Sequence, residues 1–319
     1  MTEPRLADRR IILVTGGLGF IGKTFVRRAL EHGHFVINID AVNYAADRKA
    51  LKEFQDWDTY RFITADIAAL QHLPECDFLV NFAAESHVDN SIDRNLEFCR
   101  SNFLGPHRLL ELIRARRPQD RPRFIQIGTD EVYGDIAVGR HSETDPLRPS
   151  NPYSASKAAA DMLVLGWWRT YGIDYNILRI SNNYGPHQYP EKLIPKSSAR
   201  MLRGLPALMH GDGSYLRSWL HVEDTVDAII AVMARGERCT IYNVCGDLEL
   251  SVIDAIRKIA RLLSIPEQRA YIAVEDRAGQ DLRYSMDDSR IRRLDWRPRR
   301  DFDLTLREIV QGFEFDRFI

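Results

Sequence analysis

The chain has 319 residues, 45% of them hydrophobic, and a formal net charge of -1, which is typical of a water-soluble globular protein. This charge gives no general attraction for nucleic acid or a membrane surface, and no segment approaches the roughly 20 apolar residues of a membrane-spanning helix. The first ten residues lack a signal peptide's apolar core. Because the four cysteines (Cys76, Cys99, Cys239, Cys245) have no paired spacing, we expect reduced thiols, no metal site and a cytoplasmic location.

Short apolar runs alternate with longer helical patterns through the first half of the chain. A strand, a helix and a second strand are expected at 11–15, 20–32 and 35–40, which together form a βαβ unit. Further strands are expected at 61–64, 78–82, 124–128 and 175–180, with helices at 96–116 and 153–171. Strands that are apolar throughout belong in a parallel sheet covered on both faces. The sequence therefore predicts an α/β fold with a doubly wound parallel Rossmann sheet.

The pattern changes after Ile180, where residues 181–190 indicate a long loop followed by elements of mixed order. A helix at 223–235 and a strand at 240–244 are expected to return to the main sheet, and two more helices are expected at 252–263 and 304–315. We predict a larger domain of residues 1–180 plus 223–245, and a smaller mixed C-terminal domain of residues 181–222 plus 246–319.

A glycine-rich loop, Thr15-Gly-Gly-Leu-Gly-Phe-Ile-Gly22, joins the first expected strand to the first helix. Such a loop brings backbone amides and a helix N-terminus against a pyrophosphate, although glycines also serve tight turns. Asp40 ends the second strand, where a carboxylate hydrogen-bonds the adenosine ribose and repels a 2′-phosphate. The larger domain is therefore predicted to bind NAD rather than NADP.

Candidate site residues follow three further strands. Asp66-Ile67 comes after the third strand, Ala83-Ala-Glu-Ser86 after the fourth, and Thr129-Asp-Glu131 after the fifth. Ligands of open α/β sheets bind at the carboxyl ends of the strands. We therefore expect these three segments to meet at one edge of the sheet.

Two side-chain pairs carry the chemistry. Tyr153 and Lys157 lie one helical turn apart, so the ammonium favours the phenolate, a base able to take a proton from a sugar alcohol. Asp130 and Glu131 are adjacent carboxyls, and loss of water needs one group to take a proton from carbon and another to protonate the departing hydroxyl. Adjacent residues on a continuing strand face opposite ways, so we predict that the strand has already turned at Asp130. The alternative is that the two carboxylates only decorate a turn.

The motifs resemble those of the extended short-chain dehydrogenases/reductases and, within them, the nucleotide-sugar 4,6-dehydratases. The Asp-Glu pair marks the dehydratases, because epimerases and decarboxylases of the superfamily usually lack it. The resemblance covers nearly the whole chain and rests on Ala83-Ala-Glu-Ser-His-Val-Asp-Asn-Ser91, Thr129-Asp-Glu-Val-Tyr-Gly134, Pro152-Tyr-Ser-Ala-Ser-Lys157, Ser181-Asn-Asn-Tyr-Gly-Pro186 and Pro190-Glu-Lys-Leu-Ile-Pro195.

The resemblance implies a role for each catalytic residue. Tyr153 would act as the base toward the hydroxyl on sugar carbon 4, Thr129 would hydrogen-bond that oxygen, and Lys157 would hold the nicotinamide ribose. Glu131 would remove the proton on carbon 5 and Asp130 would protonate the hydroxyl leaving carbon 6, while NAD takes a hydride from carbon 4 and returns it to carbon 6. The substrate would be a nucleoside-diphosphate hexose, with dTDP-glucose favoured.

The resemblance also implies two sets of binding residues. For the cofactor they are Gly16, Gly19, Phe20, Ile21, Gly22, Asp40, Asp66, Ile67, Ala83, Ala84, Ser86, Asn102, Tyr153, Lys157 and Asn183. For the substrate they are Ser86, His87, Asn182, Glu191, Lys192, Leu193, Pro195, Arg217, Asn243, Arg277, Gln280 and Tyr284, with arginine suited to a diphosphate by its planar fork.

The chain departs from the family pattern at several positions, although Asp130, Glu131, Tyr153 and Lys157 are intact. Departures near the nucleotide bear on the identity of the base and sugar more than on the reaction. The differing residues are Gly128 where Ser is usual, Ser218 where an acidic or amide residue is common, Pro106 for Thr, Ala278 for Pro, Gln280 for His, and Leu282 for Arg.

A homodimer is expected from the family, through a four-helix contact formed by the helices at 96–116 and 153–168. Leu109, Leu112 and Ile113, with Met162, Leu165 and Trp168, offer apolar spacing for it, or for packing on the sheet. Two other functions remain open: a 4-epimerase or other 4-keto-forming enzyme acting on a UDP-, CDP- or GDP-sugar, and a non-catalytic dinucleotide-binding module.

Overall fold

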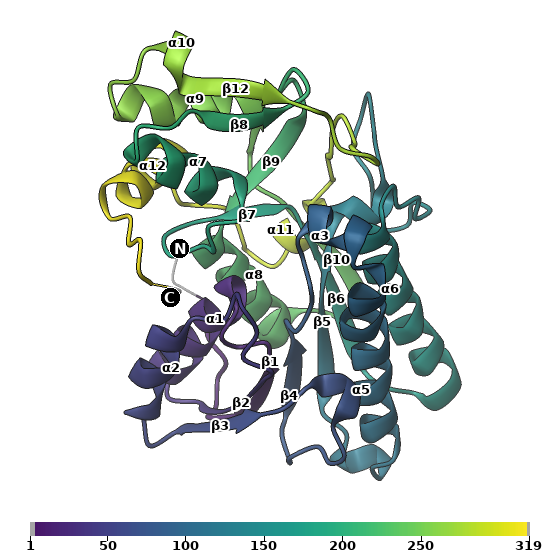
Figure 1. Cartoon of the computed structure of the whole chain (residues 1–319). Helices are drawn as coiled ribbons and strands as arrows, with labels where there is room; N and C mark the ends of the chain where they lie inside the picture. Colours follow the sequence, from purple (N-terminus) through teal and green to yellow (C-terminus); the bar gives the residue numbers. More distant parts are fainter. Residues whose placement is uncertain (1–3, 318–319) are drawn as a thin grey trace.

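A seven-stranded parallel sheet forms the centre of the structure, a computed structural model that describes residues 4–317 (Figure 1). Residues 1–3 and 318–319, at the outer ends of the two predicted domains, lie outside the described residues. The strand order is β10-β6-β5-β4-β1-β2-β3, so the predicted doubly wound sheet is confirmed. Its strands are β1 (Ile11–Thr15), β2 (Phe35–Asp40), β3 (Tyr60–Thr64), β4 (Phe78–Asn81), β5 (Arg123–Thr129), β6 (Tyr175–Ile180) and β10 (Thr240–Val244).

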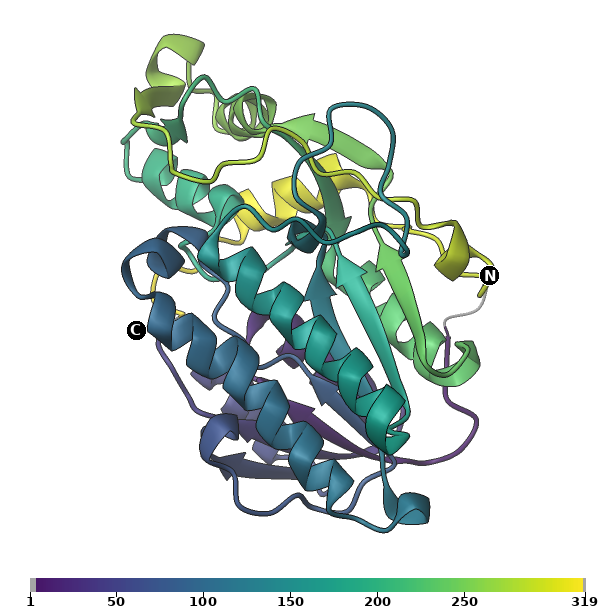
Figure 2. The same ribbon diagram turned by 90° about the vertical axis from the view of Figure 1, so that its right-hand side faces the viewer.

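Helices cover both faces of this sheet. On one face α1 (Phe20–Glu31) packs beside α8 (Val222–Arg235), and on the other α5 (Gly105–Arg114) packs beside α6 (Pro152–Tyr171). Figure 2 shows α5 and α6 running side by side across the sheet. No helix among residues 4–317 combines the length and apolar character needed to cross a membrane.

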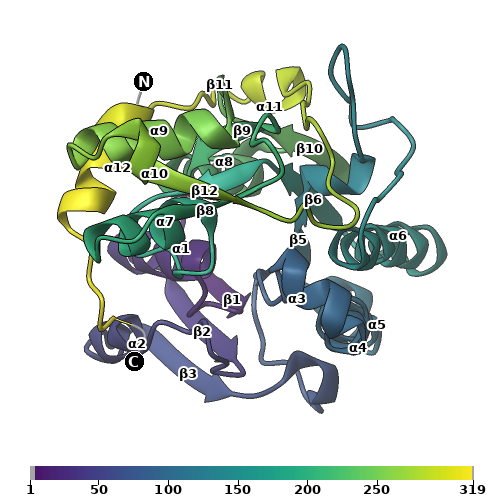
Figure 3. The ribbon, with the colours of Figure 1, turned by 45° about the horizontal axis from the view of Figure 1, so that its top comes forward.

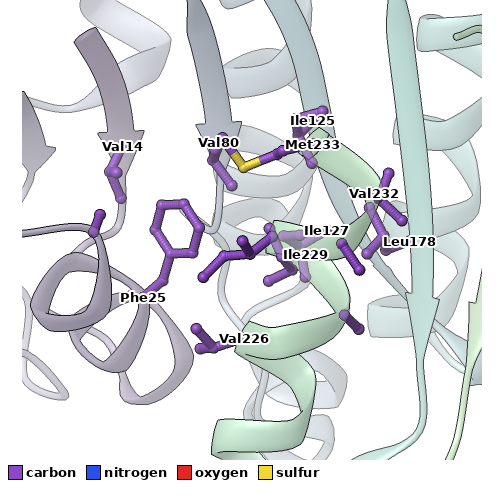
Figure 4. Packing of buried hydrophobic residues seen from close by; sticks show 14 of the residues in the cluster. Val14, Phe25, Val80, Ile125, Ile127, Leu178, Val226, Ile229, Val232 and Met233 are labelled. Atoms are coloured by element: carbon purple, nitrogen blue, oxygen red, sulfur yellow. The ribbon is translucent and has the colours of Figure 1, made fainter. Parts of the chain in front are cut away.

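Side chains of each strand alternate between the two layers of core. Leu13 of β1 packs on the α5 and α6 side, while Val14 packs on the α1 and α8 side. Figure 4 shows Phe25 of α1 and Ile229 of α8 pointing toward the strands. Because each such side chain contributes about 1.5–3 kcal/mol when fully buried, the two layers hold the edge of the sheet, and the loops on it, in place.

The loops after β1 and β4 lie against each other where the strand order reverses. Gly16 has a φ of +70°, and a Cβ on it would lie 2.6 Å from the backbone nitrogen of Ala83. Only glycine allows this approach, which leaves a crevice between two neighbouring loops at the carboxyl end of the sheet.

The smaller, mixed C-terminal region is also confirmed. Figure 3 shows most of its helices grouped beside the strands β8 and β12, whereas α11 lies near β10. A three-stranded sheet combines β7 (Asn182–Tyr184), β9 (Leu216–His221) and β11 (Leu248–Ser251), and a two-stranded sheet pairs β8 (Ala207–His210) with β12 (Tyr271–Val274). The helices are α7 (Leu193–Leu202), α9 (Val252–Leu262), α10 (Glu267–Ala270), α11 (Ser289–Arg292) and α12 (Phe302–Gln311).

The helix predicted at 96–116 is not continuous. It is divided into α4 (Asn95–Cys99), a π-helical turn η2 (Arg100–Leu104) and α5. Pro106 cannot donate a backbone hydrogen bond, and its ring would clash with the carbonyl four residues earlier. The wider turn, in which the Gly105 amide donates to Arg100 O, relieves this conflict.

Other boundaries differ because of tertiary pairing or short length. The segment 181–190 was expected to be a loop, but β7 lies within it because Asn182 pairs with Trp219 of β9, far away in sequence. The last helix ends at Gln311 rather than Phe315, with Gly312 as its C-cap. Elements not predicted are α2 (Arg48–Gln55), α3 (Val88–Asp93), η1 (Ile67–Ala69), η3 (Pro118–Asp120) and η4 (Asp130–Tyr133).

A buried polar network joins α6 to the sheet. Arg179 of β6 is 2% exposed; its Nε donates to Asp161 Oδ2 at 2.9 Å, and its Nη1 donates to the Tyr133 hydroxyl at 2.8 Å. That hydroxyl donates to Asn243 Oδ1 at 2.7 Å. Asp161 Oδ1 has no hydrogen-bond partner among residues 4–317, and a Cβ on Gly128 would lie 3.5 Å from it. The Asp161 Oδ1 atom is therefore a buried acceptor without a hydrogen-bond donor among the described residues, and it lies beside Gly128.

Replacing Gly128 with Ser should stabilise the protein, because the new hydroxyl can donate to Asp161 Oδ1. We expect the free energy of unfolding of Gly128→Ser to exceed that of Gly128→Ala by about 1 kcal/mol, measured by urea denaturation. The Ala variant is the matched control, since it adds the Cβ, 3.3 Å from Leu178 O, without the hydroxyl. A Ser variant no more stable than the Ala variant would contradict this assignment.

Candidate active site

A cavity of about 540 Å³ lies between the carboxyl edge of the main sheet and the C-terminal region. Its wall combines the loops after β1, β2, β3, β4 and β5 with the start of α6 and the segment 180–194. The three segments expected at one edge of the sheet therefore meet at one cavity, as the strand order requires.

Most residues predicted to bind the cofactor line this cavity. They are Gly16, Gly19, Phe20, Ile21, Gly22, Asp40, Asp66, Ile67, Ala83, Ala84, Ser86, Tyr153, Lys157 and Asn183. Asn102, in the π turn, lies behind the wall: its Oδ1 accepts from Glu85 N at 2.8 Å and its Nδ2 donates to Glu85 O at 2.9 Å. It braces the loop after β4 rather than facing the cavity.

The glycine loop forms a cradle for an anion. Gly19 is the N-cap of α1 and has no side chain to cap it, so the helix N-terminus opens on the cavity. A Cβ on Gly22 would lie 2.2 Å from Gly16 O, which keeps the loop tight against the helix. Asp40 Oδ2 accepts from Leu18 N at 2.9 Å, so its carboxylate is fixed beside the loop. This arrangement fits a dinucleotide pyrophosphate and its ribose.

The strand β5 has turned where the sequence required it. It ends at Thr129, and η4 begins at Asp130. Thr129 Oγ1 donates to Asp130 Oδ1 at 3.2 Å and accepts from Glu131 N at 3.3 Å. Asp130 and Glu131 consequently both line the cavity, together with Tyr153, and the predicted turn is confirmed.

Burial separates the two carboxyls from ordinary surface acids. Asp130 is 4% exposed, and burial followed by the charge of Glu131 raises its pKa to about 8. Burial also raises the pKa of Glu131, but Arg217, Lys192 and the Asn151 side chain oppose that rise. Asp130 is thus the group that carries a proton at neutral pH, while its neighbour faces donors and cations that favour a carboxylate.

Tyr153 and Lys157 lie on the first turns of α6. Asn151 starts this helix as a capping box, with its Oδ1 accepting from Ser154 N at 2.9 Å. Burial and then Glu131 raise the pKa of Tyr153, while burial lowers that of Lys157 to about 8. Burial thus favours the neutral phenol of Tyr153 and the neutral amine of Lys157 alike.

Five of the residues predicted to bind substrate line the cavity: Ser86, Asn182, Glu191, Lys192 and Leu193. Lys192 Nζ donates to Ser86 O at 2.7 Å, across the cavity from the C-terminal region to the loop after β4. Burial lowers the pKa of Lys192, and Glu191 and Glu131 oppose that effect. The cavity therefore places the Lys192 side chain where its charge acts on Glu131.

Arg217 and Tyr284 lie off the cavity wall. Arg217 Nη2 donates to Asp281 O at 3.0 Å, and its guanidinium lies 4.5 Å from the centroid of the Tyr284 ring. Tyr284 in turn donates to Asp281 Oδ2 at 2.6 Å. The positive charge of Arg217 still lowers the pKa of both Asp130 and Glu131.

Other predicted substrate residues are likewise not on the wall. Asn243 is fully buried, and its side chain is used by the Tyr133 hydroxyl and by two backbone carbonyls. Arg277 Nε lies 3.3 Å from Asp89 Oδ1, and the ring of His87 accepts from Asn90 N. Pro195 lies in α7, and Gln280 Nε2 donates to Asp281 O.

The sequence reasoning missed several cavity residues. Tyr44 donates to Glu191 Oε2 at 3.0 Å, and Asn43 Nδ2 donates to Glu85 Oε1 at 2.9 Å. Both residues follow Asp40 at the end of β2, so the rule that located the other strand ends would have found them. Lys23, one turn into α1, also lines the cavity and donates to Asp47 Oδ2 at 2.6 Å.

Comparison with known proteins agrees with this geometry. Residues 12–245 match the NAD dependent epimerase/dehydratase family. The chain is 42% identical to the low-salt glycan biosynthesis protein Agl12 of Haloferax volcanii, over 95% of this chain and 98% of that protein. It is 39% identical to the dTDP-glucose 4,6-dehydratase of Haemophilus influenzae, over 96% of this chain and 98% of that protein.

A solved structure shows the same agreement in three dimensions. The dTDP-glucose 4,6-dehydratase DesIV of Streptomyces venezuelae, solved with NAD bound, superposes with a TM-score of 0.91 at 38% identity, covering 96% of this chain and 98% of that chain. The chain therefore belongs to the NAD dependent epimerase/dehydratase family and, within it, to the nucleotide-sugar 4,6-dehydratases of the extended short-chain dehydrogenases/reductases.

Proposed function

We propose that the protein is an NAD-dependent hydro-lyase that converts a nucleoside-diphosphate hexose, dTDP-glucose, into its 4-keto-6-deoxy sugar. The observation that carries the proposal is the pair of carboxyls, buried Asp130 and partly buried Glu131, beside Tyr153 on one cavity wall. Simple alcohol oxidation needs only Tyr153 and Lys157, whereas loss of water also needs an acid and a second base. The relatives named as dTDP-glucose 4,6-dehydratases support the same reaction.

The oxidation step uses Tyr153, Thr129 and Lys157. Tyr153 takes the proton of the hydroxyl on carbon 4, and Thr129 hydrogen-bonds the same oxygen. Lys157 holds the nicotinamide ribose, and its ammonium offsets the burial that disfavours the phenolate. NAD held by the glycine loop, Asp40 and Lys157 would supply a hydride acceptor for carbon 4 and a hydride donor for carbon 6.

The elimination step divides the two carboxyls into an acid and a base. Once carbon 4 is a ketone, the proton on carbon 5 is acidic, and Glu131 removes it. Asp130, whose pKa burial raises to about 8, holds a proton at neutral pH and gives it to the hydroxyl that leaves carbon 6. Lys192 supports this division because its charge favours ionised Glu131, whereas Arg217 acts on both carboxyls in the same direction.

The proposal also assigns one ligand to each of the two domains. Residues 1–180 plus 223–245 bind NAD, and residues 181–222 plus 246–319 bind the nucleotide sugar. Lys192 is a cation that the C-terminal region contributes to the cavity wall, where it could meet a diphosphate. Arg217 and Arg277 would reach the diphosphate only after side-chain rearrangement, since both are held by acceptors or acids of the C-terminal region and α3.

The rival within the fold is a 4-epimerase or another 4-keto-forming enzyme, which would transfer hydride at carbon 4 without losing water. A second rival is a non-catalytic NAD-binding module. Retention of Tyr153 and Lys157 on the cavity wall disfavours a binding module, because a phenol and amine of this kind serve proton transfer.

We also infer a homodimer and a cytoplasmic location. Leu109 and Ile113 pack into the core on the sheet, so they cannot form the helix contact, whereas Leu104, Met162 and Trp168 are exposed. A dimer through α5 and α6 would cover these three side chains. Sedimentation of the purified chain should give the mass of a dimer; a monomer at micromolar concentration would overturn this inference.

Mass spectrometry of parallel reactions tests the proposed function. We expect purified protein to remove one water from dTDP-glucose in preference to UDP-glucose, CDP-glucose and GDP-mannose. Deuterium placed on carbon 4 should appear on carbon 6, and solvent hydrogen should enter carbon 5. Turnover without this transfer would indicate an epimerase or another oxidation, and tight NAD binding without turnover of any sugar would indicate a binding module.

Paired amide variants test the division between the two carboxyls. Glu131→Gln should still form the 4-ketone, seen as reduced nicotinamide absorbance, but should lose carbon 5 exchange and slow dehydration by about 10²–10⁴-fold. Asp130→Asn should retain carbon 5 exchange with solvent while water loss slows by a similar factor. The base would be assigned to the wrong residue if Glu131→Gln dehydrated the substrate at the wild-type rate. The same conclusion would follow if Asp130→Asn lost exchange at carbon 5 while Glu131→Gln kept it.

A further inference from the structure

Lys157 is a buried cation with little direct support for its charge. Its Nζ donates to the backbone carbonyl of Ile127 at 2.6 Å, and the residue is 5% exposed. Burial favours the neutral amine and lowers the pKa of Lys157 to about 8. Among residues 4–317, the charged group that opposes this effect is Asp161.

Asp161 lies one helical turn beyond Lys157 on α6, so both side chains project from the same face of the helix. It is fully buried, and its Oδ2 accepts from Arg179 Nε at 2.9 Å. Arg179 comes from β6, the strand next to the one that supplies Ile127 O. Burial raises the pKa of Asp161, and the charge and hydrogen bond of Arg179, followed by the charge of Lys157, oppose that rise and favour the carboxylate. The Asp161 side chain is therefore fixed between α6 and the sheet, with Arg179 supporting its negative charge.

The surrounding groups leave Asp161 as the balancing charge. Tyr133 of η4 and the carbonyl of Glu143 contact the outer side of the Arg179 guanidinium, and Tyr175 of β6 is a further titratable neighbour. Tyr153, on the preceding turn of α6, is the remaining titratable neighbour on that helix. Because Asp161 Oδ1 has no hydrogen-bond partner among residues 4–317, Arg179 is the donor found on this carboxylate.

Building on the proposed function, we propose that Asp161 is a positioning residue: held by Arg179, its carboxylate keeps Lys157 protonated for the oxidation step. The contribution is electrostatic, since two unit charges in a dry interior interact far more strongly than in water. Asp161 touches neither substrate nor cofactor in this assignment, and it acts only through Lys157.

A purely structural role would give a different result. A buried Arg–Asp pair also ties α6 to β6, and breaking one partner leaves a buried charge unpaired. Loss of stability or activity in an Asp161 variant would therefore not distinguish the two roles. The proton affinity of Lys157 distinguishes them when it is compared with that in a variant that breaks a buried ion pair elsewhere, because such a break leaves the charges near Lys157 in place.

The experiment is an NMR titration of protein carrying carbon-13 at the lysine ε position, with the Lys157 signal assigned from Lys157→Met. In Asp161→Asn we expect the proton affinity of Lys157 to fall about tenfold or more, because the carboxylate charge is gone and the Arg179 cation remains. Because the oxidation step needs protonated Lys157, the fall of kcat at high pH should begin at lower pH, by about one pH unit for each tenfold loss of proton affinity. Unchanged titration of Lys157 would overturn the proposal.

Asp227→Asn is the matched control. Asp227 is 3% exposed and accepts from Arg28 at 2.8 Å and Arg300 at 2.7 Å, between α1 and α8 and away from the cavity. It should lose stability while leaving the Lys157 titration and the pH profile unchanged. A shift of the Lys157 signal in this variant as large as in Asp161→Asn would overturn the proposal, because the effect would then be general.

A double variant covers the case in which Asp161→Asn does not fold. Asp161→Asn with Arg179→Met removes both buried charges, and the Lys157 proton affinity should lie between those of the wild type and the single variant. A value equal to that of the wild type would overturn the proposal. If wild-type protein dehydrates no nucleotide sugar, the proposed function fails, but the NMR titration still decides the role of Asp161.

Discussion

Burial of ionisable groups at the carboxyl edge of the sheet is the constraint on which the site depends. Burial raises the pKa of Asp130 to about 8 and lowers that of Lys157 to about 8. Asp130 therefore keeps its proton at neutral pH, and Lys157 holds its proton less tightly than an exposed lysine does. Charges placed around the cavity then decide which groups are ionised. Arg217 and Lys192 favour ionised Glu131, and Asp161 favours protonated Lys157.

The fold supplies this burial through its layers. Helices α5 and α6 cover the face of the sheet opposite α1 and α8, and the C-terminal region closes the edge between them. Within those layers, polar groups are held by partners from other elements, as Arg179 is by Asp161 and Tyr133. A buried charge without such partners would cost several kcal/mol, so the network and the site depend on each other.

The sequence predicted the elements whose signals are local. All seven strands of the main sheet were expected. The inner strands are nearly continuous apolar runs because they are buried on both faces, whereas the edge strand β3 is only partly buried. The turn at Asp130 also followed from a local argument, since two adjacent carboxyls can share a site only off a strand. By contrast, β7 depends on pairing with β9, which no short window of sequence reveals. The π turn had a local signal that the prediction of one continuous helix overlooked, because a proline inside a helical pattern kinks or breaks the helix.

The same distinction holds for the site residues. Motif positions at strand ends reached the cavity wall, but Asn243 did not, because its buried amide is used by Tyr133 and two carbonyls. A motif specifies which residue is present and not which partner it has. Partner choice is a tertiary property, and it separates Asn243 from Asn182 and Asn183, which line the cavity.

Hydrogen bonds across the cavity also place a condition on how ligands enter. Tyr44 donates to Glu191, and Lys192 donates to Ser86, so loops of the sheet edge are tied to the C-terminal region. A diphosphate that pairs with Lys192 must take that ammonium from Ser86 O, and the new charge-assisted bond is stronger than the one it replaces. Substrate binding would therefore exchange one tie between the two regions for another that passes through the substrate itself.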